Sequence, residues 1–181
     1  MDFEFQILNY IQDHFRSGLM DALMSTVSIM GKLSWCWVVL AIILLIIKKT
    51  RKCGITLALD VVFNLVASSL IIKPLVSRMR PCVLNRTVQV LSSIPFDGSF
   101  PSGHTLFAFG AATVIFIYNK GLGLLAYLFA CVMGFSRMYL YMHFPTDVLF
   151  GGILGIIFAV VVYSLQQSFM RKGGRRLKNA Y

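Results

Sequence analysis

The strongest constraint on this chain is a series of long apolar runs separated by short polar segments. The runs cover about residues 33–47, 54–72, 105–118, 122–135 and 148–165. Hydrophobic residues make up 57% of the chain, and this excess is concentrated in the runs rather than spread evenly. Because a bilayer core accommodates roughly 20 apolar residues of a helix, such runs predict transmembrane helices. We therefore expect an all-α fold, a polytopic transmembrane helical bundle of about six helices, the first one short.

The first residues predict a helix of another kind. Apolar residues such as Phe3 and Ile7 recur on one side of a helical repeat over 3–15, and polar residues fill the other side. This pattern is typical of an amphipathic helix at a membrane interface. The following segment, 19–31, is shorter than a full crossing, so it predicts a short crossing or a re-entrant piece. The expected parts are an N-terminal amphipathic interfacial helix over 1–18, a transmembrane domain over 19–168 and a basic tail over 169–181.

The charged residues indicate a topology. The formal net charge is +10, which a nucleic-acid-binding protein would gather on one face of a soluble fold. Here the basic residues lie instead in short clusters between apolar runs, at 48–52, Lys120 and 171–178. The positive-inside rule identifies the side that carries these clusters as cytoplasmic. We expect no nucleic-acid partner, a bacterial cell membrane protein with a cytoplasmic tail, and the polar segments 73–104 and 136–147 together at the outer face.

These two polar segments concentrate ionisable side chains. Arginine matches phosphate oxygens through its planar fork, and backbone N–H groups at the start of a helix bind anions. Fixed cations, two histidines, one carboxylate and a Ser-Gly turn therefore predict a phosphate pocket that needs no metal and no other cofactor. The candidate residues are Lys73, Arg80, Ser102, Gly103, His104, Arg137, His143 and Asp147.

His143 and Asp147 have a further relationship, because they lie four residues apart. On a helical turn this spacing lets the carboxylate hold one imidazole nitrogen and leaves the other nitrogen free to attack. Pro145 lies between them and delays the start of the helix to about Phe144, so the contact depends on local geometry. The alternative is that His143 only donates to a nearby carbonyl and that Asp147 only favours the helix dipole.

Other residues near or within the apolar runs have structural interpretations. We interpret Arg78 as a cation at the membrane edge that reaches water or lipid headgroups. Asp60 and Asn64 share a helix face, which predicts an interhelical hydrogen-bonded pair that fixes packing. Tyr139 and Tyr141 are expected to be interface anchors. The four cysteines form no C-x-x-C pair, so the sequence indicates neither a metal site nor a disulfide framework.

Three motifs resemble those of the type 2 phosphatidic acid phosphatase superfamily. They are K-x6-R-P at 73–81, P-S-G-H at 101–104 and S-R-x5-H-x3-D at 136–147, in this order and without a gap. The resemblance covers roughly 19–168 and implies a metal-independent phosphatase of the membrane.

The resemblance also implies roles for the candidate residues. His143 would be the nucleophile that accepts the phosphoryl group as a phosphohistidine, with Asp147 orienting it. His104 would be the general acid that protonates the departing oxygen. The implied phosphate clamp consists of Lys73, Arg80 and Arg137, with Ser102 and the backbone N–H of Gly103.

For a small membrane chain, this resemblance implies hydrolysis of a lipid phosphate or diphosphate, with undecaprenyl diphosphate as the first substrate. Phosphatidylglycerophosphate and phosphatidic acid are alternatives, because the motifs bind phosphate and leave the lipid tail unspecified. A vanadate-dependent peroxidase uses the same motifs, but the apolar runs argue against it. A non-enzymatic lipid-headgroup binding or transport protein is a further alternative, although it would need the cations and neither a nucleophile nor an acid.

Overall fold

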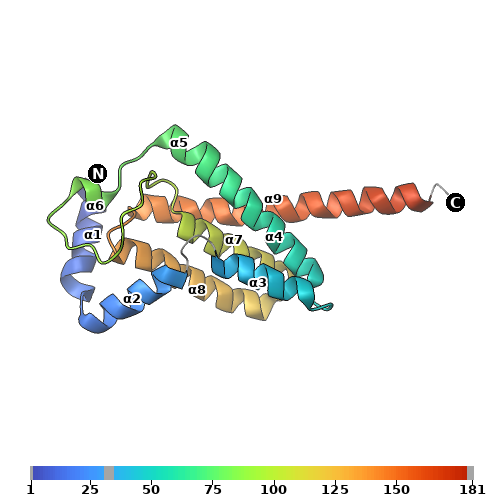
Figure 1. The fold of residues 1–181 in the computed structure, drawn as a ribbon, viewed down its shortest axis with the longest axis horizontal. Helices are drawn as coiled ribbons and strands as arrows, with labels where there is room; N and C mark the ends of the chain where they lie inside the picture. Colours follow the sequence, from blue (N-terminus) through green and yellow to red (C-terminus); the bar gives the residue numbers. More distant parts are fainter. Residues whose placement is uncertain (1, 31–34, 179–181) are drawn as a thin grey trace.

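The computed structural model describes residues 2–30 and 35–178, and the side chains of 3–30 and 35–172, as an assembly of helices without strands (Figure 1). The all-α prediction is therefore confirmed. The helices are α1 (Asp2–Phe15), α2 (Gly18–Met30), α3 (Trp35–Ile46), α4 (Arg51–Leu65), the π-helix η2 (Val66–Ile72), α5 (Lys73–Val76), α6 (Pro81–Leu84), α7 (Gly103–Tyr118), α8 (Lys120–Tyr139) and α9 (Pro145–Lys178).

Helix α7 forms the centre of the bundle. It packs along α8 and α9 and also contacts α3 and α4. A Cβ atom on Gly155 of α9 would lie only 2.4 Å from the backbone oxygen of Leu106 on α7. Because no side chain tolerates that contact, glycine at this position lets the two helix backbones meet directly. The first turns of α7 and α9 are consequently held together, and Ser102 N donates to Asp147 O across them at 3.0 Å.

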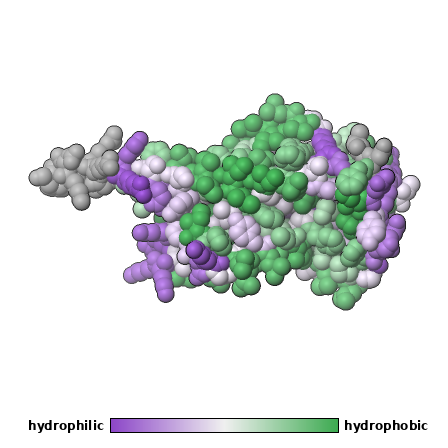
Figure 2. Space-filling view, turned by 180° about the vertical axis from the view of Figure 1, so that it is seen from behind, coloured by the Kyte–Doolittle hydropathy of each residue, from purple (hydrophilic) through white to green (hydrophobic). Residues whose placement is uncertain are grey.

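Three helical stretches of the described residues are long and apolar enough to cross a bilayer, namely Arg51–Leu84, Lys120–Tyr139 and Pro145–Lys172. Helices α2 and α3 pass the same test as a pair, and the two helices are bent by 55° relative to each other. Residues 31–34 lie outside the described residues. Helix α7 is apolar but has only 16 residues. Figure 2 shows hydrophobic residues across the middle of one face and hydrophilic residues gathered at its ends, as a membrane-embedded bundle requires.

The polar segments and the basic clusters lie at opposite ends of the bundle (Figure 1). The α3–α4 and α7–α8 connections lie at the same end as the C-terminus of α9. Helices α5 and α6, the start of α7 and the α8–α9 connection lie at the other end. The motif segments, far apart in sequence, therefore converge at one end of the molecule, which the sequence predicted.

Helices α1 and α2 cover the α8–α9 connection. Leu8 and Ile11 of α1 and Met24 of α2 are buried in one apolar cluster with Tyr139 and Tyr141. The tyrosine hydroxyls donate to Asp21 Oδ1 at 2.6 Å and to Asn9 Oδ1 at 2.7 Å. The interpretation of both tyrosines as interface anchors was therefore wrong, because the N-terminal helices bury them and bind their hydroxyl groups.

Asp60 and Asn64 are both fully buried in α4, facing α7. A Cβ atom on Gly110 of α7 would lie 2.6 Å from Asp60 Oδ2 and 2.9 Å from Asn64 Nδ2. Neither side chain has a hydrogen-bond partner among the described residues. The prediction of an interhelical hydrogen-bonded pair was wrong in this respect, because the neighbouring helix presents glycine to both side chains.

Candidate active site

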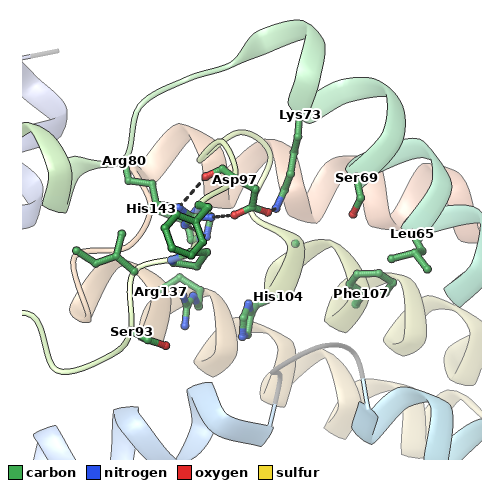
Figure 3. A pocket seen from close by; sticks show the side chains of 14 residues that line it. Leu65, Ser69, Lys73, Arg80, Ser93, Asp97, His104, Phe107, Arg137 and His143 are labelled. Carbon is green, nitrogen blue, oxygen red and sulfur yellow. Dashed lines mark hydrogen bonds and ion pairs between the residues drawn. The ribbon is translucent and has the colours of Figure 1, made fainter.

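A cavity of about 580 Å³ opens at the end of the bundle where the motif segments meet (Figure 3). Six of the eight candidate residues line it, and Ser102 and Asp147 lie behind its wall. Apolar residues of α4, α7 and the 93–97 loop complete the lining. The lining residues are Leu65, Ser69, Lys73, Arg80, Ser93, Ile94, Pro95, Phe96, Asp97, Gly103, His104, Phe107, Arg137 and His143.

Lys73 enters the cavity from the end of the helix that begins at Arg51. The preceding residues form the π-helix η2, and the N–H of Lys73 donates to Ser68 O, one residue further back than in an α-helix. Such insertions are frequent at functional sites because they rotate the following side chains relative to the regular helix. The Lys73 ammonium group pairs with Asp97.

His143 is buried, and its hydrogen bonds determine which ring nitrogen carries the proton. Nδ1 lies 2.7 Å from Ser99 O, and since a carbonyl oxygen only accepts, Nδ1 is the donor. Nε2 lies 3.1 Å from Arg80 Nη1, and since a guanidinium only donates, Nε2 is the acceptor. Burial, followed by the charges of Arg80, Arg137 and Lys73, lowers the pKa of His143 well below its usual value. The ring is thus neutral, with the Nε2 lone pair directed toward the cations of the cavity.

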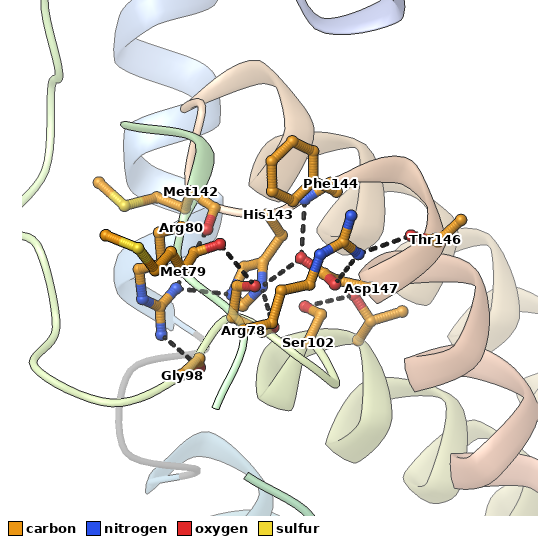
Figure 4. Close-up of polar contacts among 12 residues, drawn as sticks. Arg78, Met79, Arg80, Gly98, Ser102, Met142, His143, Phe144, Thr146 and Asp147 are labelled. Carbon is orange, nitrogen blue, oxygen red and sulfur yellow. Dashed lines mark hydrogen bonds and ion pairs between the residues drawn. The ribbon is translucent and has the colours of Figure 1, made fainter. Parts of the chain in front are cut away.

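Asp147 lies behind His143 and is fully buried (Figure 4). Its Oδ2 is 3.8 Å from His143 Nδ1, within ion-pair range but too far for a hydrogen bond. Oδ2 instead accepts from Phe144 N at 2.9 Å, one half of a capping box at the start of α9. The direct carboxylate–imidazole bond that the four-residue spacing allows is therefore absent in this structure, and the carbonyl of Ser99 holds Nδ1 in its place.

Arg78 was wrongly interpreted as a free cation of the membrane edge. Its Nη1 donates to Asp147 Oδ1 at 2.6 Å and to Thr146 Oγ1 at 2.7 Å. Its Nη2 binds Glu4 Oε2 of α1 at 2.5 Å, and its guanidinium carbon lies 4.1 Å from the ring centre of Phe144. Arg78 therefore joins α1 to the start of α9, immediately behind the cavity.

Ser102, Gly103 and His104 occupy the start of α7. The Ser102 hydroxyl is buried and lies 2.9 Å from Thr105 Oγ1, so it is held by its own helix turn. Gly103 lines the cavity, and a Cβ atom there would be 3.9 Å from Lys73 Nζ. His104 Nε2 lies 3.2 Å from Ser28 O, a carbonyl in the last turn of α2, and therefore donates to it.

Arg137 reaches the cavity from the last turn of α8 and is almost completely buried. Its Nη1 donates to the hydroxyl of Ser28, and its Nε has no hydrogen-bond partner among the described residues. Ser28 thus contacts both Arg137 and His104, a role that sequence reasoning missed. No motif signal marks it, because it belongs to a helix outside the three motif segments.

Asp97 is the second residue that sequence reasoning missed as part of the site. Its side chain is 47% exposed, and it pairs with the ammonium group of Lys73 and with Arg80 Nη2 at 2.7 Å. Partial burial would raise the pKa of Asp97, but the hydrogen bonds and charges of Lys73 and Arg80 outweigh it and hold this pKa below its usual value. The available signal was its place as an acid in a loop rich in basic residues.

Among the residues that the structure describes, no three His, Cys, Asp or Glu side chains group closely enough to hold a metal ion. What the cavity offers is an unprotonated ring nitrogen that accepts from Arg80, a second histidine and three cationic side chains including Arg80, next to an apolar wall. Such an arrangement suits an anion that is attached to an apolar molecule.

Comparisons with known proteins agree with this arrangement. The profile of the PAP2 superfamily matches residues 49–171. An undecaprenyl-diphosphatase of Sulfolobus acidocaldarius is 34% identical over 152 residues, which cover 83% of this chain and 71% of that protein. The crystal structure of Aquifex aeolicus LpxE has a TM-score of 0.76 at 28% identity, and the match covers 88% of this chain and 94% of that chain.

A transmembrane PAP2-type phosphatidylglycerolphosphate phosphatase from Bacillus subtilis shares the fold, with a TM-score of 0.74 at 22% identity over 92% of this chain and 86% of that chain. Three findings agree: the profile match, the relative from Sulfolobus acidocaldarius, and the shared bundle, which brings the three motifs to one cavity. They show that the chain belongs to the PAP2 superfamily and is a membrane lipid phosphatase of that type.

Proposed function

We propose that this enzyme hydrolyses a lipid diphosphate or phosphate through a phosphohistidine intermediate on His143. The observation that carries the proposal is the orientation of the imidazole. Ser99 O holds the proton on Nδ1, which leaves the Nε2 lone pair facing a cavity with Lys73, Arg80 and Arg137. A neutral nitrogen nucleophile among fixed cations suits phosphoryl transfer to histidine.

In the first step, Nε2 of His143 attacks phosphorus, and the bond from phosphorus to the leaving oxygen breaks. Lys73, Arg80 and Arg137 bind the phosphoryl oxygens as negative charge builds on them. His104 is the general acid of this step and gives a proton to the leaving oxygen. In the second step water attacks the phosphohistidine and gives a proton back to His104. The phosphorus–nitrogen bond breaks, and inorganic phosphate leaves while His143 returns to its neutral form.

Undecaprenyl diphosphate is the substrate that we propose first. The relative that is 34% identical bears the name undecaprenyl-diphosphatase, and the apolar part of the cavity wall supports a substrate with a hydrocarbon chain. Phosphatidylglycerophosphate and phosphatidic acid present the same phosphate chemistry and serve as the competing substrates in the test.

We further propose that the cavity faces the outside of the cell membrane and that the tail is cytoplasmic. The basic clusters at the opposite end of the bundle support this orientation through the positive-inside rule. Phe96 at the cavity and Lys172 near the C-terminus are both exposed, so cysteines placed there can be labelled. In a cysteine-free background, an impermeant thiol reagent added to whole cells should label Phe96→Cys and spare Lys172→Cys; the reverse pattern would invert the topology.

The catalytic test uses purified protein in detergent with each of the three lipids, with and without a chelator. We expect the highest kcat/KM on undecaprenyl diphosphate, no effect of the chelator, and loss of activity in His143→Ala but not in His14→Ala, which alters an exposed histidine of α1. Activity that persists in His143→Ala would refute the nucleophile assignment, and activity lost with the chelator would refute the metal-free mechanism. Lipid binding without any phosphate release would favour the non-enzymatic alternative.

A further inference from the structure

Helix α1 contributes an acidic side chain to the polar network behind the cavity. Glu4 Oε2 binds Arg78 Nη2 at 2.5 Å, and Glu4 Oε1 accepts from Thr146 Oγ1 at 2.5 Å. Arg78 in turn binds Asp147, the buried carboxylate 3.8 Å from His143 Nδ1. Three alternating charges, negative, positive and negative, thus run from α1 to the ring that we propose as the nucleophile. Figure 4 shows Arg78, Asp147 and His143 of this series.

Packing fixes both ends of this series. Leu8 and Ile11 anchor α1 in the apolar cluster of the α8–α9 connection. Phe5 places its ring edge-on against Phe144, with ring centres 5.2 Å apart, and Arg78 lies over the same Phe144 ring at 4.1 Å. Glu4 is therefore held at its contact by its own helix, and its position does not depend on the ion pair alone.

We propose that Arg78 and Glu4 are positioning residues of the phosphatase, which hold Asp147 in place and set the electrostatic balance at His143. The proposal rests on the proposed function, since it concerns the residue assigned as the nucleophile. It extends the set of functional residues beyond the three motif positions and gives the N-terminal helix a part in the reaction. A buried carboxylate without a cation is costly, so the ion pair with Arg78 holds Asp147 in place.

The direction of each effect follows from the charges that face His143. These are the cations Lys73, Arg80 and Arg137, the neighbouring His104, the carboxylate of Asp147, and Asp97 on the far side of Arg80. Arg78 neutralises Asp147, so its removal leaves more negative potential at the ring and favours the protonated form, which cannot attack. Removal of the Glu4 charge does the opposite, because the charge of Arg78 is then less compensated.

The experiment is the pH profile of kcat/KM on the lipid diphosphate for the full-length protein in detergent. The acid limb of this profile reports the protonation of the free enzyme's nucleophile. We expect Arg78→Gln to move the acid limb up by about one pH unit, the lower end of the range for a charge near a titrating group. Glu4→Gln should move it down by a smaller amount. Arg86→Gln and Asp13→Asn, which alter exposed charges of the same segments, should leave it in place.

Opposite shifts in the two variants support the proposal, because loss of structure alone would lower activity at every pH without moving the limb. Shifts in the same direction, or reduced activity with an unmoved limb, would overturn it. If Arg78→Gln fails to fold, Arg78→Lys can replace it as a variant that retains the charge. The direction in which Glu4→Gln moves the acid limb then still tests the proposal. Trapping of a labelled phosphohistidine in the wild-type protein separates the two hypotheses. Its absence would refute the proposed function, whereas its presence with unmoved limbs would refute only the role of Arg78 and Glu4.

Discussion

Replacement of Asp97 by asparagine should strengthen phosphate binding. Asp97 pairs with Lys73 and Arg80, two of the three cations that we assign to the phosphate clamp. A phosphate that binds both cations must therefore displace this carboxylate. Asparagine keeps the size of the side chain and removes its charge, while the bond from Arg80 Nε to the backbone oxygen of residue 97, at 3.1 Å, is unaffected.

The magnitude follows from the exposure of the carboxylate. Because the Asp97 side chain is 47% exposed, each of its two ion pairs belongs with surface pairs, which contribute about 0.5 kcal/mol each. Together they oppose phosphate binding by about 1 kcal/mol, which corresponds to about a fivefold change in affinity. We expect the inhibition constant for inorganic phosphate to fall about fivefold in Asp97→Asn.

The assay measures inorganic phosphate as a competitive inhibitor, with the dephosphorylated lipid quantified by chromatography so that the added phosphate does not interfere. Asp97→Glu is the matched control, because it keeps the charge and should keep an inhibition constant close to that of the wild type. An inhibition constant in Asp97→Asn that is unchanged or higher, in protein that melts like the wild type, would show that the carboxylate does not compete for the clamp.

Three further predictions concern the same cavity. Burial and nearby cations lower the pKa of His143 below its unfolded value of about 6.5, so the unfolded state binds more protons. The folded protein should therefore lose stability as the pH falls below about 6.5. Melting temperatures in detergent should show this loss of stability, and the loss should be smaller in His143→Gln. Ser28→Val should lower kcat/KM about tenfold, because Arg137 loses a hydroxyl partner, whereas Ser28→Thr should retain most activity. In double-mutant cycles on phosphate affinity, Asp97→Asn should couple to Lys73→Gln and not to Arg137→Gln, since Lys73 pairs with Asp97 and Arg137 does not.

The fold was predictable from the sequence because its strongest signal, long apolar runs between short basic clusters, also determines how a chain inserts in a bilayer. The 55° bend between α2 and α3 and the π-helix η2 were not predictable. A π-helix differs from an α-helix by one residue in hydrogen-bond register, and the apolar sequence of Val66–Ile72 is compatible with either.

The candidate site was predictable where side-chain identity carries the chemistry and not where the backbone does. Lys73, His104 and His143 were recognisable because cations and imidazoles are rare beside apolar runs. The carbonyl oxygens of Ser28 and Ser99, which hold the two histidine rings, leave no trace in the sequence, since every residue has a carbonyl.

Arg78 illustrates a second limit of prediction from sequence. Within the segment 73–81 it is one of several basic residues, and nothing local distinguishes it from a cation that reaches lipid headgroups. Its partners Glu4 and Asp147 come from opposite ends of the chain, so only the docking of α1 on the start of α9 shows its role. Long-range ion pairs of this kind are set by tertiary packing, which local charge patterns do not report.

The distribution of acids around the cations also explains how the cavity keeps its cations ordered during a catalytic cycle. Arg80 is nearly fully buried, and a buried guanidinium without a counter-charge destabilises the fold. Asp97 supplies that counter-charge from a half-exposed loop position, and the phosphate of a substrate would supply it in turn. In the mechanism that we propose, one anion replaces the other, so Arg80 would remain paired throughout and the substrate would have to overcome only the weak ion pairs of an exposed carboxylate. A deeply buried acid at the same position would bind Arg80 more tightly and compete more strongly with the substrate, so the exposure of Asp97 would favour the binding and release of phosphate that we propose for this site.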